Sequence, residues 1–357
     1  MIKLLNDWYN QHFSNPQVAI LALLLLLGFG TVVLAGDVLA PVLAAIIIAY
    51  LLDGGVDFMR TFKLPRFIAV LIVFSVFILV LLIVLFVLAP LMLKQATQFV
   101  LEIPGMLAAG QSALVLLPEK YPTIISEQLI LELLNGLRTQ LTLMSQRVLS
   151  FSLSSVVDLI AFMVYLVVVP LLVFFFLKDK DSILAWFTSF LPEDRRLVSK
   201  VWSEVNGKIA GYVRGKFMEI LIVWVVTFVT FLAFGLEYSM LLSFLVGISV
   251  LIPYVGAAVV TLPVAIVAYF QWGYNSDFLY VIVAYGVIQF LDGNLLVPLL
   301  FAGMVNLHPV AIITAVLVFG ALWGIWGVFF AIPLATLIHA VINAWPRKVD
   351  LKKTAWS

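Results

Sequence analysis

The sequence predicts an all-α polytopic membrane protein, and two features of its composition carry this prediction. Of the 357 residues, 64% are hydrophobic and only 11% are charged, whereas soluble domains carry about 25% charged residues. The second feature is a stretch from Phe217 to Pro346 that contains no Lys or Arg. Because a monomeric soluble fold rarely exposes large apolar patches, lipid is the solvent that suits this chain.

Six apolar runs approach or exceed the length of about 20 residues that a helix needs to cross the hydrocarbon core. They cover residues 18–35, 38–52, 67–93, 153–177, 217–236 and 278–301. The second run is short and holds Pro41, and the fourth holds Pro170. The sixth is interrupted at Asp292-Gly-Asn294. We expect the helix to unwind at this interruption, which membrane depth tolerates only where protein or a polar cavity surrounds the backbone.

Two further apolar regions are broken by proline and glycine. Region 239–270 is broken at 253–256, and region 310–344 is broken around 324–327. Because proline and glycine end or kink a helix, each region divides into arms of about 13–17 residues, at or below the spanning length. Each region is therefore either a re-entrant helical hairpin or a pair of short spans. The chain has about six full transmembrane helices plus these two regions, or up to about ten crossings if both regions span.

The two broken regions share a short pattern. Gly247 and Pro253 in the first recur as Gly327 and Pro333 in the second, with Ile before each proline. Paired interrupted segments are typical of binding sites at the interface of a transporter repeat, although a match this short also arises by chance in apolar sequence. The candidate gate or hinge residues are Pro253, Gly256, Gly247, Gly327, Pro333, Pro298 and Pro309. His308-Pro309 is expected to start a helix.

Two segments are polar enough to lie in water. Residues 94–150 carry mixed charges and an apolar heptad seam from Ile130 to Val148, which suits packing within the subunit or between subunits. In residues 178–216, one helix face leads into the fifth span and is marked by Leu197, Val201, Val205 and Tyr212. Gly207, Gly211 and Gly215 recur every four residues, a spacing that lets another helix approach closely.

Polar side chains inside apolar segments are costly in lipid and usually face a cavity or a partner. The candidates for a pathway are Asp158, Glu219, Asp292, Gln289, Asn294 and Arg214. Glu219 is also close enough in sequence to pair with Lys216 or Arg214 in a purely structural role. Asp292 has no basic neighbour in sequence. It is therefore either a group on a substrate or ion path, or a buried carboxylate held by backbone amides.

Signatures of catalysis are absent from the sequence. There is no Cys, no zinc-protease, nucleophile-elbow or phosphate-loop motif, and the three His residues are scattered. We therefore expect no enzyme, no metal site and no cofactor. The net charge of +1 provides no basic field for nucleic acid. Placing both termini in the cytoplasm puts 16 of the 20 Lys and Arg residues inside, as the positive-inside rule requires.

A series of motifs along nearly the whole chain resembles the AI-2E family, the autoinducer-2 exporter family of bacterial membrane proteins. The motifs are Leu39-Ala-Pro41-Val-Leu, Ala49-Tyr-Leu-Leu52, Phe176-Leu-Lys-Asp179, Gly211-Tyr-x-Arg214-Gly215-Lys216, Leu251-Ile-Pro253-Tyr-Val-Gly256, Gln289-x-x-Asp292-Gly-Asn294-x-x-x-Pro298, Asn306-Leu-His308-Pro309 and Ala331-Ile-Pro333-Leu-Ala335. Many members carry Glu where this chain has Asp292, so the resemblance does not transfer a substrate.

The resemblance implies a bacterial inner-membrane permease of a family associated with export of autoinducer-2. The broken helices, the carboxylates in apolar segments and the absence of an ATP-binding motif favour secondary transport of a small polar solute. It also implies a homo-oligomer, expected to be a pentamer, with membrane lipid, the solute and a proton or sodium ion as partners. Sodium or lithium exchange for protons is the alternative transport activity. A non-transporting oligomeric membrane scaffold, built on the heptad seam, is the alternative from another class.

The chain is expected to divide into six parts. They are a transmembrane scaffold of three spans (1–93), an extracytoplasmic helical segment (94–150), the fourth span (151–177), cytoplasmic amphipathic helices (178–216), a transport core with broken helices (217–346) and a cytoplasmic tail (347–357).

Overall fold

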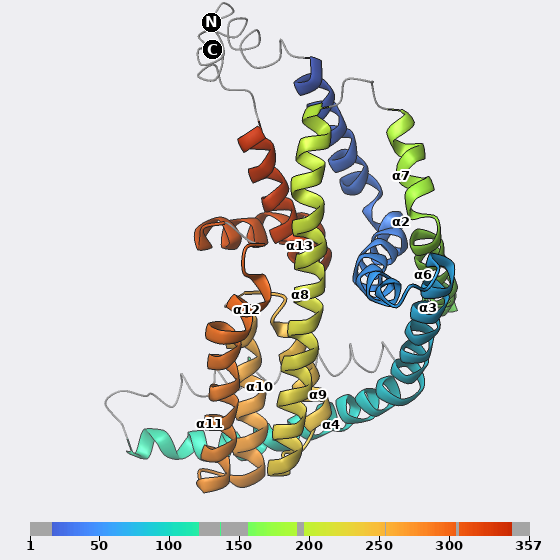
Figure 1. Ribbon diagram of the computed structural model, residues 1–357. Coiled ribbons are helices and arrows are strands. Elements are labelled where there is room, and N and C mark those ends of the chain that lie inside the picture. The colour runs from blue at the N-terminus through green and yellow to red at the C-terminus, as the bar shows by residue number, and fades with distance from the viewer. Residues whose placement is uncertain are drawn as a thin grey trace, which may run out of the picture.

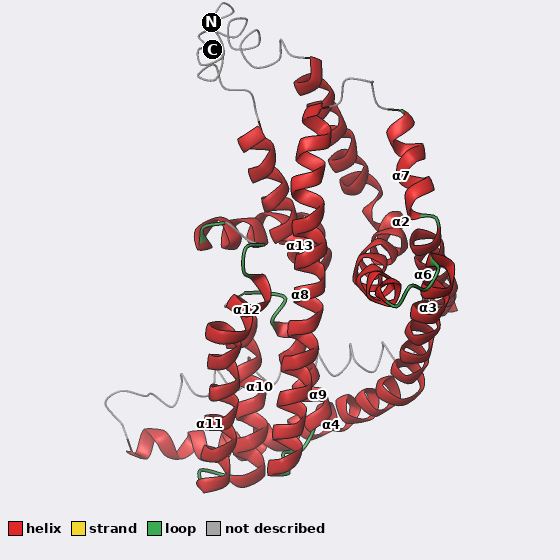
Figure 2. Ribbon diagram, viewed as in Figure 1, coloured by secondary structure: helices red, strands yellow, loops and turns green. Residues whose placement is uncertain are grey.

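The computed structural model describes residues 16–120, 136, 156–190, 196–253, 255–304 and 307–344, and every regular element in these ranges is a helix (Figures 1 and 2). Among the described residues, six helices are long and apolar enough to cross a membrane. One further pair, Phe162–Lys178 with Lys180–Ser189, qualifies together but is bent by 81°. The prediction of an all-α polytopic membrane protein is therefore confirmed.

The first two predicted runs form one long helix. Helix α2 spans Pro16–Thr61 and is kinked at Ala35, where φ is −123° and ψ is 19°. Its second arm, Val38–Thr61, is one of the six candidate spans and accommodates Pro41 inside the helix. The small side chains of Ala45 and Ala49 are buried one turn apart in this arm, which lets neighbouring helices pack close to α2.

The third predicted span is much longer than the sequence indicated. Helix α3 (Arg66–Ile83), the π-helical turn η1 (Val84–Leu88) and helix α4 (Ala89–Lys120) follow one another without a break. Their apolar part, Arg66–Met106, has 41 residues. The helix thus continues past Lys94 into the segment expected to lie in water. The heptad seam from Ile130 to Val148 lies outside the described residues.

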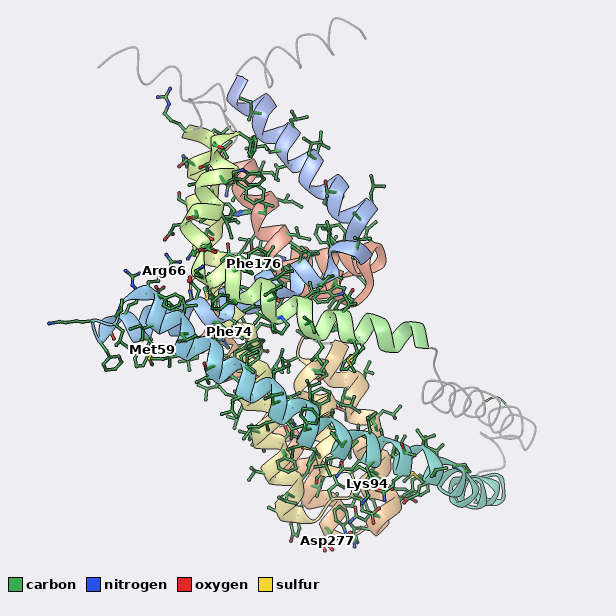
Figure 3. The ribbon with its side chains drawn as sticks, turned by 90° about the vertical axis from the view of Figure 1, so that its right-hand side faces the viewer. Met59, Arg66, Phe74, Lys94, Phe176 and Asp277 are labelled. Carbon is green, nitrogen blue, oxygen red and sulfur yellow. The ribbon has the colours of Figure 1, made fainter. Side chains whose placement is uncertain are left out.

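The N-terminal helices pack around α6 (Val156–Lys178), which contains Pro170. Buried Val70 of α3 and Val173 of α6 join the alanines of α2 in one apolar cluster. The rings of Phe74 and Phe174 meet edge to face at 5.2 Å. Phe74 and Phe176 lie in the region where α3 and α6 meet (Figure 3). Helix α7 (Lys180–Ser189) follows α6 directly.

Helix α8 (Arg196–Phe234) runs through the centre of the molecule in Figure 1. Its 39 residues join the amphipathic segment to the fifth predicted span in one helix, about 58 Å long at 1.5 Å per residue. Val201, Val205 and Tyr212 are buried on this helix. The apolar face predicted from their spacing is therefore confirmed.

Helices α9 (Ser239–Ser249), α10 (Val255–Trp272) and α11 (Ser276–Leu291) pack beside one half of α8 (Figure 1). The buried core between them includes Phe231, Leu242, Val246, Val264 and Tyr285. Helix α4 crosses this bundle at its end, where Gln95 Oε1 accepts a hydrogen bond of 2.9 Å from the Leu241 backbone N–H. That amide is in the first turn of α9 and has no partner within its own helix.

Three elements complete the fold. After α11, the π-helical turn η2 (Asp292–Leu296) leads into α12 (Val297–Phe301). The expected unwinding at Asp292-Gly-Asn294 is therefore wrong. The chain stays helical there, and the π-helical turn holds one more residue than an α-helical turn. Gly293 has no side chain to pack and Pro298 has no N–H to donate, so the ordinary hydrogen-bond pattern is weakened there. Helix α13 (Pro309–Ala344) begins at Pro309 as predicted.

Candidate functional site

The first broken region ends helix α9 beside the middle of α8. Helix α9 stops at Ser249, and α10 begins at Val255. A Cβ on Gly256 would lie 1.7 Å from the Ser249 carbonyl oxygen, so only glycine lets α10 start this close to the end of α9. Around Pro253 the turn is stabilised by backbone hydrogen bonds between residues close in sequence, such as the bond of 3.0 Å from the Ile252 N–H to the Ser249 carbonyl oxygen. The break is thus a compact turn whose last helical carbonyls need outside donors.

Lys216 of α8 supplies one such donor. Its Nζ donates to the Val250 carbonyl at 2.9 Å and to Glu219 Oε2 at 2.6 Å. The two side chains are 5% and 2% exposed, and the Phe301 ring lies 5.3 Å from Nζ. An ammonium at the negative end of the α9 dipole is favourable. Lys216 and Glu219 therefore form a buried ion pair at the broken end of a helix.

Asp292 adds a second carboxylate to this pair. It interacts electrostatically with both Lys216 and Glu219. Its Oδ1 atom and the Nε2 atom of Gln289 are buried without a hydrogen-bond partner among the described residues. Gln289 and Asp292 are three positions apart at the junction of α11 and η2, so they share one face of the helix. We name Lys216, Glu219, Gln289 and Asp292 the charge cluster.

Glycines of α8 and α9 allow the elements around the charge cluster to approach. A Cβ on Gly215 would lie 3.0 Å from the Phe301 ring, and one on Gly211 would lie 2.7 Å from Met304 Sδ. A Cβ on Gly247 of α9 would lie 2.7 Å from Trp224 Cβ. At Gly207 a Cβ would meet nothing within 4 Å. The glycine spacing in α8 therefore marks a close approach at two of its three positions.

The second broken region also contacts α8, one helical turn before Lys216. Helix α13 turns sharply at Gly324, where φ is 59° and ψ is −134°, and a Cβ on Gly327 would lie 1.8 Å from the Phe319 carbonyl oxygen. The Tyr212 hydroxyl of α8 donates to the Phe329 carbonyl at 3.4 Å. Tyr212 and Lys216 are four residues apart, so both broken regions are held by adjacent turns of one helix.

Other predicted site residues lie away from the charge cluster. Asn294 is exposed, and its Nδ2 donates to Phe290 O at 2.9 Å. Arg214 is exposed on another face of α8, where its Nε donates to Ala210 O at 3.2 Å. Asp158 lies in α6, but its side chain is outside what the structure describes. Pro298 and Pro333 lie inside helices α12 and α13.

Sequence reasoning treated Lys216 only as a structural partner of Glu219 and did not single out Thr227. Thr227 is fully buried in α8, and its Oγ1 has no partner among the described residues. Both positions had a signal in the sequence. Lys216 precedes Glu219 by one helical turn, and Thr227 follows it by two, so all three fall on one face of a helix.

The comparison with protein families identifies the chain's relatives. Residues 20–347 match the family described as AI-2E family transporter. The chain is 46% identical over 346 residues to the Escherichia coli (strain K12) protein named "Putative permease PerM", covering 97% of this chain and 98% of that protein. It is 26% identical over 326 residues to the Bacillus subtilis (strain 168) protein named "Putative transport protein YueF", covering 88% and 85%. The chain therefore belongs to the AI-2E family of membrane transporters, which are not enzymes.

Proposed function

We propose that the chain is a secondary transporter that exports a small polar solute, of the autoinducer-2 kind, across the bacterial inner membrane. The observation that carries the proposal is the charge cluster. Charged side chains at membrane depth are costly and mark ion or substrate paths. Here three of them gather where α9 is broken, and the Asp292 Oδ1 and Gln289 Nε2 atoms are buried there without a hydrogen-bond partner among the described residues.

The charge cluster provides a way to couple transport to an ion. With Lys216, Glu219 and Asp292 all ionised, the cluster carries one net negative charge. Binding of one cation makes it neutral, and a neutral cluster costs less to keep away from water. Uptake and release of that cation on opposite sides of the membrane would bias the two orientations of the broken helices. Pro253, Gly256, Gly247, Gly327, Pro333, Pro298 and Pro309 are the proposed hinges.

In the proposed organisation, residues 217–346 form the transport core, to which Lys216 contributes from the end of the preceding segment. Residues 1–93, 94–150, 151–177 and 178–216 form the scaffold and assembly parts. Residues 347–357 form a cytoplasmic tail, and both termini are cytoplasmic. The subunits assemble as a homo-oligomer, for which the family resemblance suggests a pentamer. Native mass spectrometry of the detergent-solubilised protein measures the number of subunits.

Transport in reconstituted vesicles tests the proposal. Autoinducer-2 serves as the test solute, and a pH-sensitive dye inside the vesicles reports proton movement. Asp292→Asn is expected to abolish the part of solute flux that a pH gradient drives. Asp277→Asn is the matched control, because Asp277 is exposed in the first turn of α11, the helix that leads into Asp292. Unchanged coupled transport in Asp292→Asn would remove Asp292 from the mechanism.

The same vesicles separate the alternatives. Sodium/proton or lithium/proton antiport predicts that adding either cation alone dissipates the pH gradient without any solute. If the chain is a non-transporting scaffold, we expect no flux of any kind in the vesicles. Its scaffold activity would then persist in every variant of the charge cluster.

A further inference from the structure

We infer that Lys216 is a built-in cation that holds the position of an alkali-metal ion, so that the charge cluster exchanges a proton and not sodium or lithium. This inference rests on the proposed function, since it names the coupling ion of the same site. It also separates secondary transport coupled to protons from the sodium or lithium alternative.

The position of the Lys216 ammonium is the first reason. Transporters coordinate sodium with backbone carbonyls at the C-terminal ends of broken helices. In this chain that end is the α9 terminus, and its Val250 carbonyl accepts a hydrogen bond of 2.9 Å from Lys216 Nζ. The nearest carboxylate oxygen, Glu219 Oε2, lies 2.6 Å from the same nitrogen. Lys216 therefore bonds to both kinds of oxygen that a sodium ion needs.

The confinement of Lys216 is the second reason. Its side chain is 5% exposed, the Phe301 ring covers the ammonium at 5.3 Å, and a Cβ on the adjacent Gly215 would lie 3.0 Å from that ring. A lysine held this closely does not leave for an arriving ion without moving α12. Among the described residues, no group of three or more His, Asp or Glu side chains offers a separate metal site.

Charge balance then points to the proton. The titratable groups that interact electrostatically with the ammonium are Glu219 on its own helix and Asp292 on η2, and the Tyr212 phenol interacts with Glu219. A metal ion added to this set would lie beside a fixed positive charge. A proton neutralises one carboxylate without any additional ligands. Asp292 is the acceptor, because its Oδ1 has no partner among the described residues while Glu219 is bonded to Lys216.

Thermal unfolding of the full-length protein in detergent tests the inference. Wild type, Lys216→Gln and Lys216→Arg are compared in sodium chloride, lithium chloride and choline chloride at equal ionic strength. Wild type and Lys216→Arg are expected to unfold at the same temperature in all three salts. Lys216→Gln frees the Val250 carbonyl and Glu219 for a metal ion, so its Tm is expected to rise by about 3 °C in sodium or lithium relative to choline.

Two outcomes overturn the inference. One is a sodium- or lithium-dependent rise of Tm in wild type, and the other is a folded Lys216→Gln that shows no rise. If Lys216→Gln does not fold, binding of radioactive sodium to wild type decides the question, with saturable binding against the inference and none in its favour. These measurements detect ion binding without transport, so they are independent of the vesicle experiment that tests the proposed function.

Discussion

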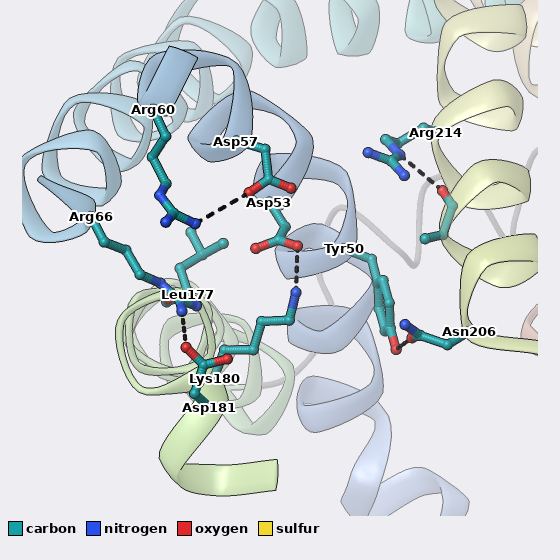
Figure 4. Close-up of polar contacts among 11 residues, drawn as sticks. Tyr50, Asp53, Asp57, Arg60, Arg66, Leu177, Lys180, Asp181, Asn206 and Arg214 are labelled. Carbon is teal, nitrogen blue, oxygen red and sulfur yellow. Dashed lines mark hydrogen bonds and ion pairs between the residues drawn. The ribbon is translucent and has the colours of Figure 1, made fainter. Parts of the chain in front are cut away.

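The Tyr50 hydroxyl in α2 donates a hydrogen bond of 2.7 Å to Asn206 Oδ1 in α8 (Figure 4). One turn further along α2, a Cβ on Gly54 would lie 2.8 Å from Arg214 Nη1. These two contacts join the N-terminal helices to the helix that carries Lys216 and Glu219. On its other side, α2 is tied to α7 by the ion pair between Asp53 and Lys180 at 2.7 Å. Helix α2 therefore makes polar contacts with both α7 and α8.

Removing the Tyr50 hydroxyl tests this link. Tyr50→Phe leaves the ring in place but deprives Asn206 of its donor, and a net hydrogen bond contributes about 0.5–1.5 kcal/mol. We expect a small decrease in the Tm of the detergent-solubilised protein. Tyr280→Phe is the control, since Tyr280 is 59% exposed on α11 and its substitution is expected to leave the Tm unchanged. Equal effects of both substitutions would show that the contact between α2 and α8 contributes nothing.

The glycines at the two breaks lead to a second prediction. A Cβ on Gly256 or Gly327 would lie 1.7 Å or 1.8 Å from a backbone carbonyl oxygen. A backbone atom cannot move aside as a flexible side chain does, so Gly256→Ala and Gly327→Ala are expected to reduce the yield of folded protein severely. Gly286→Ala is the control, because a Cβ there meets nothing within 4 Å. It is expected to stabilise α11 by about 0.5–1 kcal/mol.

Size-exclusion chromatography of the detergent-solubilised variants measures the yield of folded protein. Normal elution of Gly256→Ala or Gly327→Ala would contradict the close approach at that break.

The periodicity and charge of the sequence predicted the positions of the helices better than they predicted the connections between them. The spacing of Val201, Val205 and Tyr212 predicted a face of α8, because burial on one side of a long helix leaves a repeat of 3.6 residues in the sequence. The composition of Asp292-Gly-Asn294 predicts an unwound segment, whereas the structure has a π-helical turn there. A π-helical turn accommodates the same glycine and polar residues at a lower free-energy cost than an unwound segment, since the backbone keeps its hydrogen bonds.

The site was predicted only in part. Asn294 follows Asp292 by two residues, which is about 200° around an ordinary helix, and it is exposed while Gln289 and Asp292 are partly buried. The contact of Lys216 with Val250 joins residues 34 positions apart and depends on where α9 ends. That end was predicted from Pro253, but its position beside α8 was not.

The buried ion pair leads to a third prediction. Glu219→Gln leaves the Lys216 charge without its nearest carboxylate, and breaking a buried pair costs about 3–5 kcal/mol. Lys216→Met has a similar effect, because it leaves Glu219 unpaired and removes the donor to Val250. The double variant removes both charges of this pair and leaves Asp292 as it is in Lys216→Met, so it is expected to unfold at a higher temperature than the sum of the two single effects predicts. Additive effects in this double-mutant cycle, measured as Tm, would argue against coupling between the two side chains.

The last prediction concerns the turn between α8 and α9, which a single amide side chain clamps. Gln271 at the end of α10 accepts a hydrogen bond of 2.8 Å from the Glu237 backbone N–H, and its Nε2 donates to the Gly235 carbonyl at 2.8 Å. Gln271→Ala removes both bonds, which together contribute about 1–3 kcal/mol. Gln271→Glu keeps the acceptor but replaces the donor with a carboxylate oxygen that repels the Gly235 carbonyl.

We therefore expect Gln271→Glu to be no more stable than Gln271→Ala, although glutamate is closer to glutamine in shape. The Tm of each variant in detergent at neutral pH measures the effect. Lowering the pH protonates the introduced carboxyl group and returns a donor, so the Tm of Gln271→Glu is expected to recover toward wild type below about pH 4. Gln271→Ala is the matched control, because it has no group to protonate and its deficit is expected to persist. A deficit of the same size at both pH values in Gln271→Glu would show that the bond to Gly235 does not stabilise the turn.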